Sequence, residues 1–132
     1  MARKPFVLPK ELETPANLSK EGKNAVTAIV RLLKKHHATH MGGCKAFYSP
    51  IEWAARGEKY GCNSVLVLVH DGGALRDFCN YDAECPSRIE AMIKALEPLG
   101  LYVESCTGWY SAVYESSPAP KAAYVELETA GD

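Results

Sequence analysis

The sequence predicts one small domain of the α+β class, in which three helices lie mainly on one face of a largely antiparallel sheet of three to five strands. Three observations predict this class: helical periodicity in separate segments, an unbroken apolar run over residues 65–69, and two alternating segments joined by Thr107-Gly108. The chain has 132 residues, of which 47% are hydrophobic and 23% charged. It is therefore long enough to bury one core and too short for two.

The N-terminal part divides into an irregular arm and a first helix. Residues 1–18 contain prolines among charged residues and lack periodicity, which predicts an arm outside the regular structure. The α+β domain is expected over residues 19–128, with a short tail over 129–132. From Ser19 onward apolar residues recur at steps of three and four, and Gly42-Gly43 is the expected end of this helix.

The clearest helix start in the sequence is at Ser49. The tetrapeptide Ser-Pro-Ile-Glu that begins there fits a capping box, in which the glutamate reaches back to the backbone of the serine. This second helix is expected to end near Lys59, and residues 44–48 before it are expected to form a short strand. Residues 65–69, Val-Leu-Val-Leu-Val, predict a central strand buried on both faces.

The second half of the chain predicts an edge strand, a third helix and a hairpin. Residues 75–81 are expected as the edge strand, and the apolar spacing of the segment after it predicts the helix. Two alternating segments, 101–106 and 109–114, flank Thr107-Gly108 and predict a tight antiparallel hairpin. Residues 124–127 are expected either to add a further edge strand or to stay a loose tail.

The hairpin carries the candidate interaction surface. A two-residue loop places Cys106 opposite Trp109, and pairing outward from there leaves an almost wholly apolar face to meet the helices. This face consists of Leu101, Val103, Ser105, Tyr110, Ala112 and Tyr114. The opposite face mixes aromatic with polar residues, and exposed Trp and Tyr side chains favour protein interfaces. The candidate contact residues on it are Tyr102, Glu104, Trp109 and Ser111.

His70 and Asp71 are the candidate catalytic residues. They follow the central strand, and residues at the carboxyl end of such a strand often line a crevice. The non-catalytic alternative is that this segment only forms a turn, because Asp-Gly-Gly is itself a turn sequence. Cys106 is a candidate nucleophile beside His70, although a buried free cysteine usually serves as a small apolar residue.

His36, His40 and Cys44 form the candidate metal site. Two histidines one helical turn apart can share a metal ion, and a thiolate just past the helix end can supply a third ligand. The alternative is that both histidines continue the apolar stripe of the first helix, since Gly42-Gly43 gives Cys44 no defined approach. No bound cofactor is expected.

Charge and cysteine content limit the classes of partner and compartment. Lys and Arg number 15 against 16 Asp and Glu, a net charge of -1, so no overall field favours nucleic acid or anionic lipid. Basic residues crowd the first helix, but a solvated helix face explains them, and nucleic acid is not expected as a partner. The 5 cysteines, an odd number, and the lack of an export or membrane-spanning segment indicate reduced thiols and a cytoplasmic protein.

The sequence therefore predicts a small, cytoplasmic, non-enzymatic binding or inhibitor protein that acts through protein–protein contacts. Its partner is expected to be another protein or a second copy of the chain in a homodimer. The alternative is a small enzyme or metal-binding protein, built around His70-Asp71 or around the group of His36, His40 and Cys44. In size and composition the chain resembles the compact accessory proteins that bacteria, phages and plasmids encode, a likeness that assigns no residue.

Overall fold

The computed structural model describes residues 8–116 and confirms the α+β class. Four strands form one antiparallel, open sheet in the order β1-β2-β4-β3, so β1 and β3 are its edges. The tail at 129–132 and the segment 124–127 lie outside the described residues. In chain order the 3-10 turns (η), helices and strands are η1 (Lys10–Leu12), α1 (Lys20–Lys35), β1 (Phe47–Tyr48), α2 (Pro50–Ala55), β2 (Leu66–Val69), α3 (Arg76–Cys79), η2 (Tyr81–Ala83), α4 (Pro86–Leu96), η3 (Glu97–Leu99), β3 (Leu101–Ser105) and β4 (Tyr110–Glu115).

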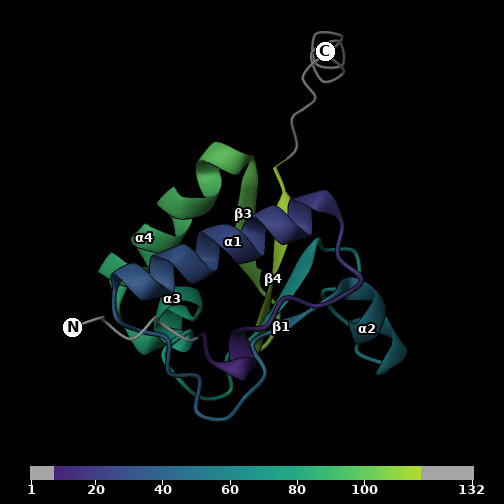
Figure 1. Ribbon diagram of the computed structural model, residues 1–132, viewed down its shortest axis with the longest axis horizontal. Coiled ribbons are helices and arrows are strands. Elements are labelled where there is room, and N and C mark those ends of the chain that lie inside the picture. Colours follow the sequence, from purple (N-terminus) through teal and green to yellow (C-terminus); the bar gives the residue numbers. More distant parts are fainter. Residues whose placement is uncertain (1–7, 117–132) are drawn as a thin grey trace, which may run out of the picture.

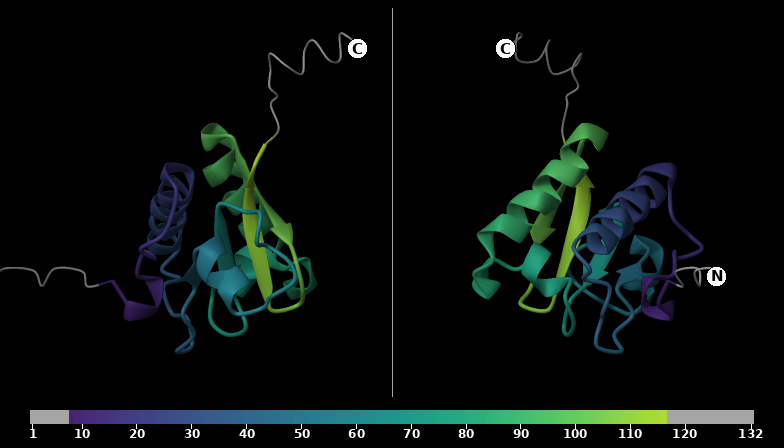
Figure 2. Two further views of the ribbon diagram at one scale, coloured as in Figure 1. Left: turned by 90° about the vertical axis from the view of Figure 1, so that its right-hand side faces the viewer. Right: turned by 60° about the vertical axis from the view of Figure 1, so that its left-hand side comes forward.

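The helices divide unequally between the two faces of the sheet. α1, α3 and α4 share one apolar core with Leu66 and Leu68 of β2, and α1 lies beside α4 (Figures 1 and 2). We call this side of the sheet the helix-covered face. α2 sits far from α4 in Figure 1 and supplies Trp53 to a smaller core with Val67 and Val69, which we call the Trp53 face. Most helices thus lie on one face, as the sequence predicts.

The part of the N-terminal arm that the structure describes packs onto the domain. It contains one short 3-10 turn, and Leu12 at the end of this turn is fully buried in the larger core. The Ala46 N–H donates to the Glu11 carbonyl at 2.9 Å, which ties the arm to the segment before β1. Residues 8–18 are therefore irregular but not detached.

α1 begins where the sequence predicts and ends earlier. Ser19 is the N-cap, and its Oγ accepts a hydrogen bond from the Gly22 N–H at 3.1 Å. The helix ends at Lys35 and not at Gly42-Gly43. The cause is His37, whose φ of 53° is left-handed and stops the helical hydrogen bonding.

α2 confirms the capping box at Ser49. The Ser49 N–H donates to Glu52 Oε1 at 2.9 Å, and the Glu52 N–H donates to Ser49 Oγ at 3.0 Å. The helix ends at Ala55 rather than near Lys59, because Gly57 takes a φ of 85° and the chain turns away.

The predicted edge strand over residues 75–81 is wrong, because this segment contains the one-turn helix α3. Leu75, Phe78 and Cys79 are buried, and their spacing of three and four residues is helical rather than alternating. The Phe78 N–H donates to the Leu75 carbonyl at 3.0 Å, and α3 packs against α4. The domain therefore has four α-helices within the described residues, where the sequence predicts three.

The hairpin forms, but its predicted register is wrong by one residue. Val103 pairs with Val113, and the loop is longer than two residues. Cys106 and Thr107 both donate to the Tyr110 carbonyl, at 3.1 and 3.0 Å, so two residues oppose one as in a β-bulge. The shift moves every side chain of β4 to the other face. Val113 consequently lies beneath the helices, and Tyr110 lies in the smaller core on the Trp53 face.

Candidate interaction surface at the free edge of the sheet

β3 is an edge strand whose outer side offers backbone hydrogen-bonding groups. The bonds from Ser116 N–H to Gly100 O at 2.7 Å and from Cys106 N–H to Tyr110 O at 3.1 Å bracket the pairing of β3 with β4. Because antiparallel bonding alternates, even-numbered residues of β3 bond to β4 and odd-numbered residues direct N–H and C=O outward. The outward residues are Leu101, Val103 and Ser105. Such an edge is a template for a further strand.

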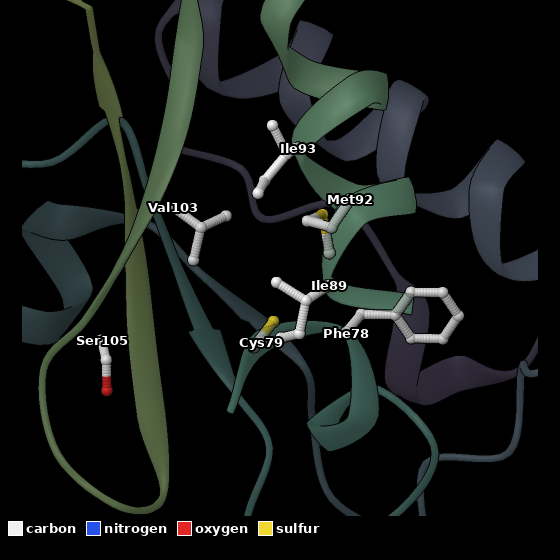
Figure 3. Close-up of a pocket in the computed structure, with 7 residues that line it drawn as sticks. All are labelled: Phe78, Cys79, Ile89, Met92, Ile93, Val103 and Ser105. Atoms are coloured by element: carbon white, nitrogen blue, oxygen red, sulfur yellow. The ribbon is translucent and has the colours of Figure 1, made fainter. Parts of the chain in front are cut away.

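A small apolar cavity lies beside this edge, between β3 and α4. Figure 3 shows Val103 and Ile93 pointing toward each other across it from the two elements. Its volume of about 30 Å³ is far below the roughly 300–1,000 Å³ of a typical ligand pocket. The cavity is thus an indentation for one small apolar group rather than a ligand pocket. Ile93 at its rim is 49% exposed, which leaves apolar surface for an added chain to cover.

The Trp53 face of β3 is only partly covered and carries tyrosines. Tyr102 is 45% exposed, and its ring centre lies 5.8 Å from that of its cross-strand partner Tyr114. Tyr60, Glu104 and Tyr114 are among the residues that line one recess of about 510 Å³ on this face. Solvent-facing phenol rings combine apolar contact area with a hydrogen-bonding group, a combination that favours contacts with another protein.

Two of the four candidate contact residues lie on this surface and two lie elsewhere. Tyr102 and Glu104 are exposed on β3. Trp109 is half-buried in the hairpin loop, where its ring centre lies 4.6 Å from that of Tyr110. Ser111 is fully buried on the helix-covered face, because the register shift exchanges the two faces of β4. The surface therefore excludes Ser111, and Trp109 serves chiefly to pack the loop.

Two groups of the recess, the Cys106 thiol and the Tyr114 hydroxyl, have raised pKa values and stay protonated at neutral pH. Burial raises the pKa of the Cys106 thiol, and the Glu104 carboxylate and the Cys62 thiol raise it further. Burial also raises the pKa of the Tyr114 hydroxyl, with Cys106 and Glu104 again adding to the effect. A protonated thiol is a poor nucleophile, so Cys106 is not activated for covalent chemistry.

His70 is a buried core residue rather than an accessible catalytic group. Its side chain is fully buried after β2, and Nε2 lies 2.9 Å from Ser111 Oγ in hydrogen-bond contact. A base and a hydroxyl at this distance resemble a catalytic pair, but no substrate can reach them because both residues are fully buried. Asp71 is exposed, and Cys106 lies on the opposite face of the sheet. The structure does not bring these candidates together.

The stability of the domain is expected to fall in mild acid because of His70. Burial is the main cause that lowers the pKa of this imidazole below 6.5, and the Arg76 guanidinium adds to it. Between the two pKa values, His70 is therefore protonated in the unfolded chain and neutral in the folded chain. The stabilisation by neutral His70 is thus complete above about pH 7 and is lost as the pH falls below about 6.5. Urea unfolding at several pH values between about 5 and 8 measures this loss.

Two substitutions isolate the contribution of His70 to this pH dependence. His70→Gln keeps a hydrogen-bonding side chain but does not titrate, so its free energy of unfolding should fall less between neutral and mildly acidic pH. His40→Gln, at an exposed position, should retain the dependence of the unsubstituted protein. Identical pH profiles for all three proteins would show that His70 does not titrate differently on folding.

His36, His40 and Cys44 are not assembled as a metal site. α1 ends before His40, so the two imidazoles are not one helical turn apart, and the ring of His36 lies edge-on to Phe78 at 5.5 Å. Among residues 8–116, no three His, Cys, Asp or Glu side chains group closely enough to hold a metal ion. The predicted site depends on a helix that continues to Gly42-Gly43, and that helix end is wrong.

The contribution of α4 to the surface is not among the features predicted from the sequence. Ile89, Met92 and Leu96 are buried on one stripe of this helix, whereas Ile93 stands beside the stripe and is half-exposed. An apolar residue that lies beside the buried stripe of an amphipathic helix can indicate that the helix has a further contact surface. The outward backbone groups of β3 carry no such signal, because strand order depends on pairing between distant segments.

In the part of the chain that the structure describes, no helix combines the length and apolarity needed to span a bilayer. All five cysteines lie in this part and are unpaired thiols. Comparisons with protein-family models, with curated proteins and with solved structures found no match. The edge of β3 and its neighbouring side chains are thus the basis for inferring a function.

Proposed function

We propose that the protein is a non-enzymatic binding domain that captures an extended segment of another protein along β3. The direction of the Leu101, Val103 and Ser105 backbone groups away from β4 carries this proposal. When a strand is added to a sheet edge, main-chain hydrogen bonds supply affinity and pockets for alternate side chains supply selectivity. β3 offers both, since the apolar cavity beside Ile93 adjoins the outward groups.

The two sides of β3 favour different side chains in the partner. On the helix-covered face an added strand meets Val103 and the half-exposed Ile93, which favours Val, Ile or Leu. On the Trp53 face it meets Tyr102 and Glu104, which favours an aromatic or basic residue opposite the carboxylate. The expected partner is therefore a segment in which apolar residues alternate with aromatic or basic ones.

A cytoplasmic location and an accessory or inhibitory role follow from the same proposal. Five unpaired cysteines suit a reducing compartment, where their thiols stay free. A domain that covers a segment of another protein prevents that segment from making its other contacts. Inhibition then needs no catalytic residue, which fits a His70 that is enclosed in the core.

Ser105→Pro is expected to weaken peptide binding without unfolding the domain. Proline lacks the N–H that Ser105 directs outward, and edge strands tolerate proline at such positions. Ser105→Ala keeps the N–H and is the matched control. The probes are peptides selected for binding from a displayed random library, with affinity measured by fluorescence anisotropy. Loss of one or two hydrogen bonds of ~1 kcal/mol each should weaken binding ~5- to 30-fold.

Peptide-induced shifts of backbone amide resonances locate the binding site independently of affinity. The largest shifts are expected at Leu101, Val103 and Ser105, and both Ser105 variants should unfold at nearly the same temperature. Selected peptides that shift the resonances of other elements, or that bind both Ser105 variants equally, would argue against strand capture. A homodimer that Ser105→Pro dissociates would assign the edge to a second copy of the chain instead.

A further inference from the structure

We infer that Cys62 and Cys106 are a redox-sensitive pair of thiols, which join in a disulfide when small disulfides accumulate around the protein. Both side chains line the recess on the Trp53 face. They come from distant parts of the chain, since Cys62 lies between α2 and β2 and Cys106 directly follows β3. The inference concerns a covalent modification of this recess and does not depend on peptide capture at β3.

The backbone just before Cys62 lies against the sheet beside Cys106. A Cβ added to Gly61 would lie 3.7 Å from Cys106 Sγ and 3.5 Å from Ala112 Cβ. Consecutive Cα atoms are about 3.8 Å apart, and a disulfide joins Cα atoms roughly 4.4–6.8 Å apart. Gly61 has a φ of 85° and no side chain that would resist a shift of this loop. A local movement is therefore enough to bring the two sulfur atoms together.

The two thiols already interact, and weak contacts hold them in their present positions. The Cys62 thiol adds to the raised pKa of Cys106, and both thiols add to the raised pKa of Tyr114. Cys62 Sγ donates to the Glu58 carbonyl at 3.4 Å, and Cys106 Sγ donates to the Glu104 carbonyl at 3.9 Å. Because a thiol is a weak hydrogen-bond donor, these contacts oppose rotation of the side chains only slightly.

The other three cysteines are poorly placed to compete for Cys62. Cys79 is buried in the core on the helix-covered face, so the sheet separates it from the recess. Cys85 is the N-cap of α4, which packs on that same face. Cys44 packs against the smaller core but does not line the recess. Cys106 is thus the partner that the fold offers to Cys62.

The oxidant is a small disulfide of the glutathione type, and the reaction is two successive thiol–disulfide exchanges. The Cys62 thiolate attacks one sulfur of the small disulfide, which breaks its S–S bond and releases one small thiolate. The Cys106 thiolate then attacks Cys62 Sγ and releases the second. The two protein thiols are oxidised, the small disulfide is reduced, and two protons pass from the protein thiols to the released thiolates.

The order of the two exchanges follows from the surroundings of Cys106. Its thiol stays protonated at neutral pH, so Cys62 is the first nucleophile. Cys106 acts second, where its closeness to the mixed disulfide raises its effective concentration. In a reducing compartment both thiols stay free, and the bond forms only when the ratio of small disulfide to small thiol rises.

Peptide mapping after oxidation identifies the partner of Cys62. The folded protein is incubated with glutathione disulfide, free thiols are alkylated, and tryptic peptides are analysed by mass spectrometry. Trypsin places Cys62 in peptide 60–76, Cys106 in 95–121, Cys44 in 36–45, and Cys79 with Cys85 in 77–88. Peptide 60–76 linked to 95–121 should be the main linked species. Cys106→Ser should leave a glutathione mixed disulfide on Cys62, whereas the control Cys85→Ser should keep the link.

The same oxidation in urea shows whether the fold selects this pair. In the unfolded chain Cys62 should link mainly to peptides 36–45 and 77–88, because the shorter loops close with a smaller loss of entropy. The linked folded protein should melt ~5–15 °C above the reduced protein, since the bond restricts the unfolded chain. Three results would each overturn the inference: mixed disulfides without a link, the same distribution of links with and without urea, or a linked form that melts below the reduced one.

Discussion

Replacing Trp53 with alanine is expected to lower the free energy of unfolding by ~3–5 kcal/mol. Trp53 is fully buried, and its ring centre lies 4.9 Å from those of Tyr48 and Tyr110 and 5.8 Å from that of Trp109. The Arg56 guanidinium lies over the same ring at 4.5 Å. Because these neighbours belong to separate elements, they cannot all close on the space that truncation would leave, and a cavity remains.

Urea unfolding followed by circular dichroism measures this loss, since tryptophan fluorescence itself changes in the variant. Ile51→Ala is the control in the same helix, because Ile51 is 64% exposed and its truncation should cost little. Trp53→Phe should fall between the two: it keeps a ring and removes an indole N–H that has no partner within the described residues. A loss below ~1 kcal/mol for Trp53→Ala would mean that the smaller core contributes little to stability.

Gly73→Ala is the second substitution expected to have a large effect, a destabilisation of ~2–5 kcal/mol. Gly73 has a φ of 88°, a left-handed conformation that strains any residue with a side chain. A Cβ there would also overlap the backbone of Met41 and lie 2.7 Å from its carbonyl oxygen. The neighbouring segments cannot easily part, because the Ala74 N–H donates to the His40 carbonyl at 2.8 Å.

Gly72→Ala is the matched control for Gly73→Ala at the adjacent position. A Cβ on Gly72 would meet nothing within 4 Å, so this variant should keep nearly the full melting temperature. Thermal unfolding of the two variants at one protein concentration is the comparison. Equal melting temperatures would mean that the loop after β2 moves away from Met41 at little cost.

The features that could be predicted from the sequence are those fixed by neighbouring residues. The capping box at Ser49 needs only four consecutive residues, and the buried strand β2 follows from an apolar run bounded by turn sequences. The end of α1 could not be predicted in this way, because no pattern in the neighbouring residues indicates the left-handed backbone of His37. α3 could not be predicted for a similar reason. One turn of helix contains too few residues to distinguish helical spacing of apolar residues from the alternation of a strand.

The candidate site could be predicted only in part. Tyr102 and Glu104 follow from alternation within β3 alone, and their exposure on the Trp53 face agrees with it. The face on which Ser111 lies could not be predicted, because one extra residue in the hairpin loop reverses the faces of β4. The burial of His70 against Ser111 joins two strands far apart in the chain. No local pattern reports such a contact.

The place of β4 between β2 and β3 has a consequence for the order in which the chain folds. The pairing of β3 with β4 is local and can form within microseconds, whereas β2 and β4 must close a loop that contains α3 and α4. Until the hairpin docks, one edge of β2 lacks a paired strand, and Leu66 and Leu68 lack their contacts with the apolar residues of the hairpin. During synthesis the apolar strand β2 therefore lacks its β4 neighbour until the last described strand has been made, and its unpaired edge is open to non-native contacts throughout that interval.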